Sequence, residues 1–258
     1  SISSGNMLFI VLFSILFGVI LRSSNSVSTD VVRNFWEGIY HVFVKIMYFI
    51  LYFTPYGVFC LIAKATMNFE PESYLILSKF FITVISALLI HVIIFYSIVL
   101  IIFKINVISH LKGISSALFV AFSTSSSVAT IPVTTRCLIE KLNYKEEKVN
   151  FIIPIGATIN MDGTALFECV VVIFIAQLYG VDLTVIDQFL ILSLALITSV
   201  GVAGIPSASF VAIVVILSAV GLPFEAVGLI LGIDRLLDML RTSVNVYGDS
   251  CCVSVLSK

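Results

Sequence analysis

A stripe of polar and charged residues in the last apolar segment carries the strongest chemical signal in the sequence. Six such residues recur at helical spacing: Asp234, Asp238, Arg241, Thr242, Asn245 and Asp249. At about 100° per residue, all six fall within an arc of roughly 100° on one helix. A charge at the centre of a bilayer costs at least about 2.5–3.5 kcal/mol. We therefore expect this arc to face protein, water, ions or a ligand rather than lipid.

The structural alternative for this stripe is an internal ion-pair network in which Asp238 pairs with Arg241. Such a network explains the paired charges, but it leaves surplus carboxylates in an apolar segment. Surplus carboxylates indicate that cations bind there. The stripe therefore favours a combined ligand and cation site.

A second polar group, Asn160-Met161-Asp162-Gly163-Thr164, interrupts the apolar run 151–180. Asn, Asp, Gly and Thr are poor residues for the middle of a helix, so they predict an unwound turn. Unwinding frees carbonyl oxygens, and hard cations such as Na⁺ prefer oxygen ligands. A simple polar kink is the alternative interpretation.

The composition predicts that lipid surrounds most of the chain. Hydrophobic residues make up 60% of the 258 positions, charged residues 11%, and the mean hydropathy is +1.17. Soluble domains usually carry about 25% charged residues. The net charge of −1 gives no reason to expect a nucleic-acid partner. The five cysteines are read as small packing residues, and the start of the chain predicts no signal peptide and a piece of a longer protein.

The elements that must position these residues are apolar helices. A spanning helix needs about 20 apolar residues, and the runs 7–21, 33–64 and 80–103 are candidates. His41, His91 and His110 are scattered and are read as structural or interfacial. Trp36 is read as an interface anchor.

Two later segments predict hairpins rather than plain spans. Residues 113–135 are uncharged but carry a serine-rich centre and Pro132, and residues 188–224 are too long for one span and are interrupted by Gly and Pro. Their tips, VATIP (128–132) and VAGIP (202–206), resemble each other, as expected for two repeats. Basic residues flank the first hairpin, which predicts that its open end is cytoplasmic and that the second hairpin enters from outside.

The chain resembles the dicarboxylate/amino acid:cation symporter family, the glutamate transporters. The resemblance rests on four stretches in family order: SSSVATIPVT (125–134), PIGATINMDGTALFE (154–168), SVGVAGIPSAS (199–209) and DRLLDMLRTSVNVYGDS (234–250). It implies an all-α membrane protein, a multi-span helical transporter with two re-entrant hairpins and inverted repeats. Residues 1–104 would be a partial scaffold domain that begins within the family's fourth helix. Residues 112–258 would be the transport domain, with hairpin 1, a broken helix, hairpin 2 and the last helix.

The resemblance also implies a substrate site. Arg241 would bind the side-chain carboxylate of an acidic amino acid and Asp238 its α-amino group, which favours an amino acid over a C4-dicarboxylate. The remaining contacts would come from the polar pocket and the two tips: Thr164, Thr242, Asn245, Ser126, Ser127, Gly204, Ile205 and Ser209. Ser125 stands where certain members have a tip arginine, and Arg235 lies near the start of the last stripe instead.

Sodium sites are implied in the same way. Asp249 with carbonyls of Gly156, Asn160 and Asn245 would form one site. Carbonyls of Thr158, Ser199, Val200 and Val202 would form a second, and Asn160 with Asp162 would serve a third. Glu168 matches a glutamate of proton-coupled members and is the candidate proton carrier; a polar helix residue is the alternative.

The resemblance therefore predicts sodium-driven import of L-glutamate or L-aspartate by alternating access, with a proton as the candidate second coupling ion. We expect a multi-pass protein of the plasma or inner membrane, a homotrimer if the first helices are present, and no organic cofactor. A C4-dicarboxylate symporter and an inactive fragment lacking the first helices are the alternatives. Rivals from other classes are an anion channel and an intramembrane protease built on Tyr247-Gly248-Asp249; we expect no enzyme.

Overall fold

The computed structural model describes residues 7–24, 26–52, 56, 71–201 and 209–257. All regular elements among these residues are helices, which confirms the all-α prediction. The chain separates into two compact units, residues 1–74 and 75–258. The predicted boundary at 104–112 concerns which parts move during transport, and it stays a prediction.

The first unit contains α1 (Met7–Ser23) and α2 (Val27–Tyr52). α2 begins before the predicted position 33 because Ser26 and Thr29 form a reciprocal cap. The Ser26 backbone N–H donates to Thr29 Oγ1 at 3.0 Å, and the Thr29 N–H donates to Ser26 Oγ at 3.3 Å. Such a cap satisfies two backbone donors at the helix start. Phe17 of α1 meets Trp36 of α2 edge to face, with ring centroids 6.2 Å apart.

The second unit begins within one long helix, which is formed by α4 (Pro71–Ile90), a π-helical turn η1 (His91–Tyr96) and α5 (Ser97–Ile102). Its stretch Leu75–Ile102 is one of three among the described residues that are long and apolar enough to cross a membrane; the others are Val107–Thr124 and Glu146–Leu178. Large apolar side chains such as Ile82 and Ile93 are exposed along it. An exposed apolar face suits contact with lipid.

The serine-rich centre breaks the next helix, as predicted. α6 (Val107–Thr124) ends at Ser125, whose φ of 51° is left-handed, and α7 (Ser127–Arg136) begins after the extended Ser126. Ser126 Oγ accepts the backbone N–H of Ala129 at 3.2 Å and so caps α7. α6 and α7 pack against each other, and a short π turn, η2 (Cys137–Lys141), follows. That this pair is re-entrant in a membrane stays a prediction.

The predicted unwound turn is also present. α8 (Glu146–Ile159) ends and α9 (Asp162–Leu178) begins on either side of Asn160 and Met161, whose backbone angles are not helical. α10 (Val185–Gly201) and α11 (Ser209–Ala219) pack against each other as two arms. The predicted tip between these arms, at 202–208, lies outside the described residues.

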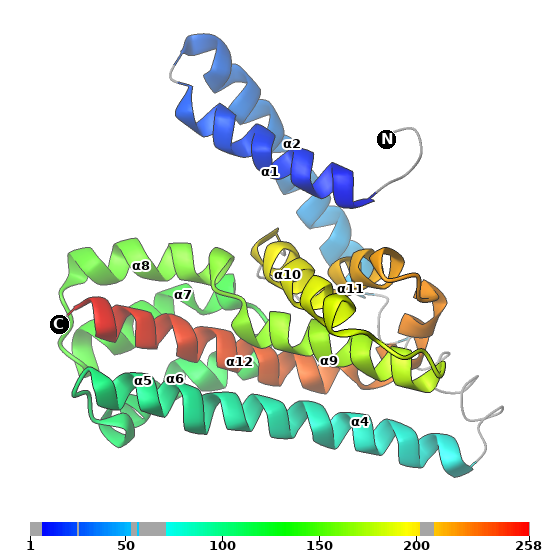
Figure 1. Ribbon diagram of the computed structural model, residues 1–258. Helices are drawn as coiled ribbons and strands as arrows, with labels where there is room; N and C mark the ends of the chain where they lie inside the picture. The colour runs from blue at the N-terminus through cyan, green and yellow to red at the C-terminus, as the bar shows by residue number, and fades with distance from the viewer. Residues whose placement is uncertain (1–6, 25, 53–55, 57–70, 202–208, 258) are drawn as a thin grey trace. The chain divides into compact units, whose positions relative to one another are not determined.

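After η3 (Phe224–Leu229), the final helix α12 (Leu231–Leu256) runs through the middle of the second unit. It packs against α6, α7, α8 and α9, and Figure 1 shows it, in red, between α8 and the long α4–α5 helix. Buried His110 of α6 is hydrogen-bonded to Ser250 and Ser254 of α12. This packing brings the polar stripe of α12 against the break between α8 and α9.

Candidate functional site

All six stripe residues of α12 are buried, and the most exposed of them, Asp238, shows only 7% of its surface. Arg235 and Leu236 on the same helix are exposed. The prediction that the stripe faces protein rather than lipid is therefore confirmed. The burial follows from the central position of α12 and is required by the cost of leaving charges in an apolar medium.

Arg241 is the centre of this stripe and is 1% exposed. Its Nη2 lies 2.9 Å from Asp238 Oδ1 and 3.1 Å from Asp234 Oδ1. Its Cζ lies 3.7 Å from the centroid of the Phe167 ring, a cation–π contact. The pairing anticipated as the structural alternative is thus present.

The ion pairs use only one of the guanidinium nitrogens. Among the described residues, Nη1 and Nε of Arg241 have no hydrogen-bond partner although both are buried. Buried polar atoms are normally hydrogen-bonded, and guanidinium N–H groups are well suited to binding a carboxylate. Arg241 therefore keeps N–H donors on two nitrogens that can bind a carboxylate while Nη2 retains its contact to Asp234.

Asn245 connects α12 to the unwound turn between α8 and α9 by hydrogen bonds. Its Oδ1 accepts the backbone N–H of Gly163 at 2.8 Å, and its Nδ2 donates to Thr164 Oγ1 at 3.1 Å. A Cβ at position 163 would lie 3.0 Å from both the Arg241 carbonyl oxygen and Asn245 Oδ1. The close approach of α9 to α12 therefore depends on glycine at this position. Thr164 and Thr242 are buried beside these contacts.

Asp249, at the other end of the stripe, meets the end of α8. Its Oδ1 accepts a hydrogen bond from Asn160 Nδ2 at 3.0 Å. A Cβ at position 156 would come within 2.5 Å of the same oxygen, so Gly156 leaves the room for this carboxylate. No ion pair to Asp249 occurs within the described parts of the chain. The structure thus brings together Asp249, Asn160 and Gly156, three of the predicted sodium ligands.

Asp162 lies at the start of α9 and contacts η1. His91 Nε2 and the Tyr96 hydroxyl both lie 2.5 Å from its Oδ2, while its buried Oδ1 has no hydrogen-bond partner among the described residues. The sequence analysis missed His91 and Tyr96 as site residues. Their spacing gave no signal, because residues five apart lie on different sides of an ordinary α-helix.

Glu168, one turn beyond Thr164, is fully buried. Its Oε2 accepts a hydrogen bond from Thr198 Oγ1 of α10 at 3.1 Å, and its Oε1 has no hydrogen-bond partner within the described residues. A carboxyl group buried among helices is costly in its charged form. The position is therefore suited to a carboxyl that exchanges a proton.

The other predicted residues are distributed along the helix ends. Ser126, Ser127, Ser199 and Ser209 are buried, whereas Thr158 and Val200 are exposed. The carbonyls of Val202, Gly204 and Ile205 lie outside the described residues. The described residues contain no group of three His, Cys, Asp or Glu side chains placed to hold a metal ion. The ligand roles of these residues stay predictions.

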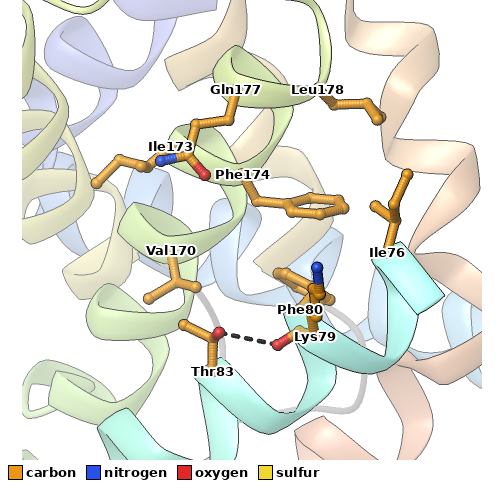
Figure 2. A pocket seen from close by; sticks show the side chains of 9 residues that line it. All are labelled: Ile76, Lys79, Phe80, Thr83, Val170, Ile173, Phe174, Gln177 and Leu178. Carbon is orange, nitrogen blue, oxygen red and sulfur yellow. Dashed lines mark hydrogen bonds between the residues drawn. The ribbon is translucent and has the colours of Figure 1, made fainter.

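A separate pocket of about 620 Å³ lies between α4 and α9. Figure 2 shows its mostly apolar lining, with Lys79 as the charged residue and Thr83 donating a hydrogen bond to the Lys79 carbonyl oxygen. None of the predicted site residues lines it. The candidate site is therefore the buried polar cluster around α12 rather than this pocket.

A helical fold with apolar exposed faces and a buried polar site around broken helices is the arrangement expected of an integral membrane protein of the transporter class. The family model for the sodium:dicarboxylate symporter family matches residues 1–258. The chain belongs to this family.

Curated relatives agree with the family. The chain is 37% identical over 258 residues to the proton/sodium-glutamate symport protein of Bacillus caldotenax, covering all of this chain and 61% of the relative. It is 34% identical to the proton/glutamate-aspartate symporter of Escherichia coli, covering 59% of that protein. It is 40% identical over 251 residues to human excitatory amino acid transporter 2, covering 95% of this chain and 43% of the relative. The chain thus spans about three fifths of the bacterial relatives' length.

Proposed function

We propose that this chain carries the substrate and cation sites of a sodium-driven importer of acidic amino acids, L-glutamate or L-aspartate. The observation that carries the proposal is the buried Arg241, which is paired with two acids yet keeps two guanidinium nitrogens, Nε and Nη1, without hydrogen-bond partners among the described residues. The names of the relatives, which are glutamate and glutamate–aspartate symporters, support the same substrate class.

The substrate exchanges partners with an existing ion pair. Arg241 Nη2 lies 2.9 Å from Asp238 Oδ1. An acidic amino acid offers a carboxylate to Arg241 and an ammonium to Asp238, so the number of ion pairs does not fall when it binds. A C4-dicarboxylate lacks the ammonium and would leave Asp238 without that partner. A buried charge that loses its partner is costly, which favours an amino acid over the dicarboxylate alternative.

The remaining roles follow the family resemblance. Thr164, Thr242 and Asn245 complete the pocket, and the two tips close over the substrate through Ser126, Ser127, Gly204, Ile205 and Ser209. Glu168 carries a proton in addition to the sodium ions. Residues 112–258 move against a scaffold formed in part by 1–104, and this alternating movement exposes the site to each side of the membrane in turn.

Sodium ions are co-transported and need oxygen ligands rather than a preformed metal cluster. The first site would use Asp249 with carbonyls of Gly156, Asn160 and Asn245, and the third would use Asn160 with Asp162. The second would use carbonyls of Thr158, Ser199, Val200 and Val202. Two carboxylates in the described structure fit a cation best. Asp162 has an Oδ1 without a hydrogen-bond partner, and Asp249 has a neutral hydrogen-bond donor, Asn160, but no ion-pair partner. The proposal includes no organic cofactor and no enzymatic reaction, and it places a homotrimer, when the family's first helices are present, in the plasma or inner membrane.

The test is uptake of labelled aspartate, glutamate and succinate into proteoliposomes, with and without an inward sodium gradient. We expect sodium-dependent uptake of aspartate or glutamate and little of succinate. Arg241→Ala should abolish this uptake while the protein remains folded. Arg235→Ala, which removes an exposed arginine from the same helix, is the matched control and should retain it.

Three results would count against the proposal. Uptake of acidic amino acids without sodium would show that sodium does not drive transport. A preference for succinate would favour the dicarboxylate alternative. Normal aspartate uptake by Arg241→Ala would overturn the assignment of the carboxylate-binding residue.

A further inference from the structure

The π-helical turn η1 directs two side chains at one acid. Residues five apart point about 140° away from each other in an α-helix. A π turn closes hydrogen bonds between residues five apart, so such residues lie one above the other. His91 and Tyr96 are the first and last residues of η1, and both contact Oδ2 of Asp162. Without the π turn, one helix could not present both groups to the same oxygen.

Both contacts go to the same side of the carboxylate. An ionised carboxylate only accepts hydrogen bonds, so the Tyr96 O–H and the His91 Nε2–H donate to Oδ2. Oδ1 is buried and has no hydrogen-bond partner among the described residues. One oxygen is therefore held by the protein, and the other is oriented and left free for a cation.

The surrounding packing fixes the two donors. The His91 ring stacks on Phe95, with centroids 5.0 Å apart and planes at 7°. The Tyr96 ring packs edge to face on Tyr247 of α12, with centroids 5.5 Å apart. A Cβ at position 248 would collide with the Tyr96 hydroxyl, so glycine at this position leaves the space that the hydroxyl occupies. Each donor is thus held by contacts that do not involve Asp162.

We propose that η1 is a positioning element of the cation site, in which His91 and Tyr96 act as positioning residues that orient Asp162 for sodium. The proposal rests on the sodium sites of the proposed function, and it assigns to His91, Tyr96 and Gly248 a role that their spacing in the sequence does not reveal. Groups that orient a ligand of a metal ion typically change metal affinity by about 10–100-fold when they are removed.

The experiment measures sodium binding by the thermal stability of the purified chain, without amino acid and without transport. Choline chloride holds the ionic strength constant while the sodium concentration is varied. We expect Tyr96→Phe and His91→Leu each to raise the sodium concentration for half-maximal stabilisation by about tenfold. His91→Gln should restore most of the affinity, because its amide Nε2 can donate to the same oxygen.

Two further variants separate positioning from general destabilisation. Tyr247→Phe removes a hydroxyl from the adjoining buried tyrosine, which makes no hydrogen bond to Asp162 in the described structure. It should leave the sodium concentration for half-maximal stabilisation unchanged. Gly248→Ala adds a Cβ that would crowd the Tyr96 hydroxyl and would also lie 3.0 Å from Asn160 Nδ2, so it should weaken sodium binding at least as much as Tyr96→Phe does. The unfolding temperature without sodium reports whether each variant is folded.

Unchanged sodium dependence in folded Tyr96→Phe and His91→Leu would overturn the positioning role, as would an equal loss in His91→Leu and His91→Gln. Absence of any sodium response in the unaltered chain would also overturn it. Sodium binding that shows the expected variant pattern, in a chain that transports nothing, would support the positioning role and count against the transport function alone.

Discussion

At the scale of single residues, the site is a balance of buried charges. Arg241 forms ion pairs with Asp234 and Asp238. Asp162 instead contacts His91 and Tyr96, and Asp249 accepts a hydrogen bond from the neutral Asn160. An uncompensated buried charge is strongly destabilising. Sodium ions at the second pair of acids would supply the missing positive charge. In the function that we propose, the first pair of acids lies on the substrate side of the site and the second pair binds the cations.

Glu168 is the residue whose role is easiest to separate from substrate binding. It is buried, accepts a hydrogen bond from Thr198 and makes no ion pair with Arg241 among the described residues. Glu168→Gln keeps the shape of a protonated glutamate but cannot release a proton. We expect this variant to bind aspartate and to lose the acceleration of uptake that an inside-alkaline pH gradient gives to the unaltered protein.

The measurement is aspartate uptake into proteoliposomes with and without an imposed pH gradient. Thr198→Val is the control, because it removes the hydrogen-bond donor to Glu168 Oε2 and leaves the carboxyl group in place. Its uptake should still respond to the gradient. A full response in Glu168→Gln would show that the proton travels elsewhere.

At the scale of elements, the chain breaks its helices at positions that we assign to the proposed substrate and cation sites. The turns at 125–126 and 160–161 end one helix and start another inside the packed unit. Non-helical backbone at membrane depth is tolerated only when protein or a water-filled cavity surrounds it. Ser125 is buried and left-handed at its break, with φ of 51°. This conformation is normally unfavourable for residues other than glycine.

Ser125 therefore gives a prediction about the first tip. Ser125→Gly should change the free energy of unfolding by less than about 1 kcal/mol, because glycine adopts this conformation readily but is more flexible when unfolded. Ser125→Val should destabilise the protein by about 1–3 kcal/mol, because a β-branched residue is strained there. Thermal unfolding in detergent measures both effects, and a loss of 1 kcal/mol lowers the midpoint by about 2–4 °C.

The control for Ser125→Val is the same substitution two residues earlier, Ser123→Val. Ser123 is exposed on α6, and its hydroxyl donates to the Val120 carbonyl oxygen of the preceding turn, so Ser123→Val should cost about a few tenths of a kcal/mol because of helix propensity. Equal losses at positions 123 and 125 would contradict strain at Ser125 as the cause.

At the scale of the whole molecule, sodium-coupled transport requires that sodium and the amino acid bind together to the same folded conformation. A ligand present at about 100 times its dissociation constant stabilises the folded state by about 2.7 kcal/mol. We expect saturating aspartate to raise the unfolding midpoint by several degrees in sodium chloride and far less in choline chloride. Linkage requires that aspartate in turn increases the apparent affinity for sodium.

Differential scanning fluorimetry of the purified chain across both salts measures this coupling. Asp249→Asn should shrink the difference between the salts, because it removes a carboxylate that we assign to sodium. Equal stabilisation by aspartate in sodium and in choline would contradict the coupling.

The sequence alone was sufficient for the fold class and for most of the polar cluster. Charges on one arc of an apolar helix must be buried, because lipid excludes them, and α12 buries all six. The same reasoning located the break at 160–161, since Asn, Asp, Gly and Thr oppose a continuous helix. The serine-rich tip was likewise found from residues that favour breaks. These inferences rest on local chemistry, which each segment carries by itself.

Only the tertiary structure decided which groups meet. The pairing of Arg241 with Asp234 as well as Asp238 depends on side-chain conformations that helical spacing does not specify. The π turn of η1 could not be predicted, because it is a departure from the periodicity on which the sequence analysis relied. Contacts such as Tyr96 to Asp162, 66 positions apart, exist because packing brings η1 beside the start of α9. The sequence by itself thus determined that this protein buries charge within a membrane fold, and the packing of its helices decided how each acid is held.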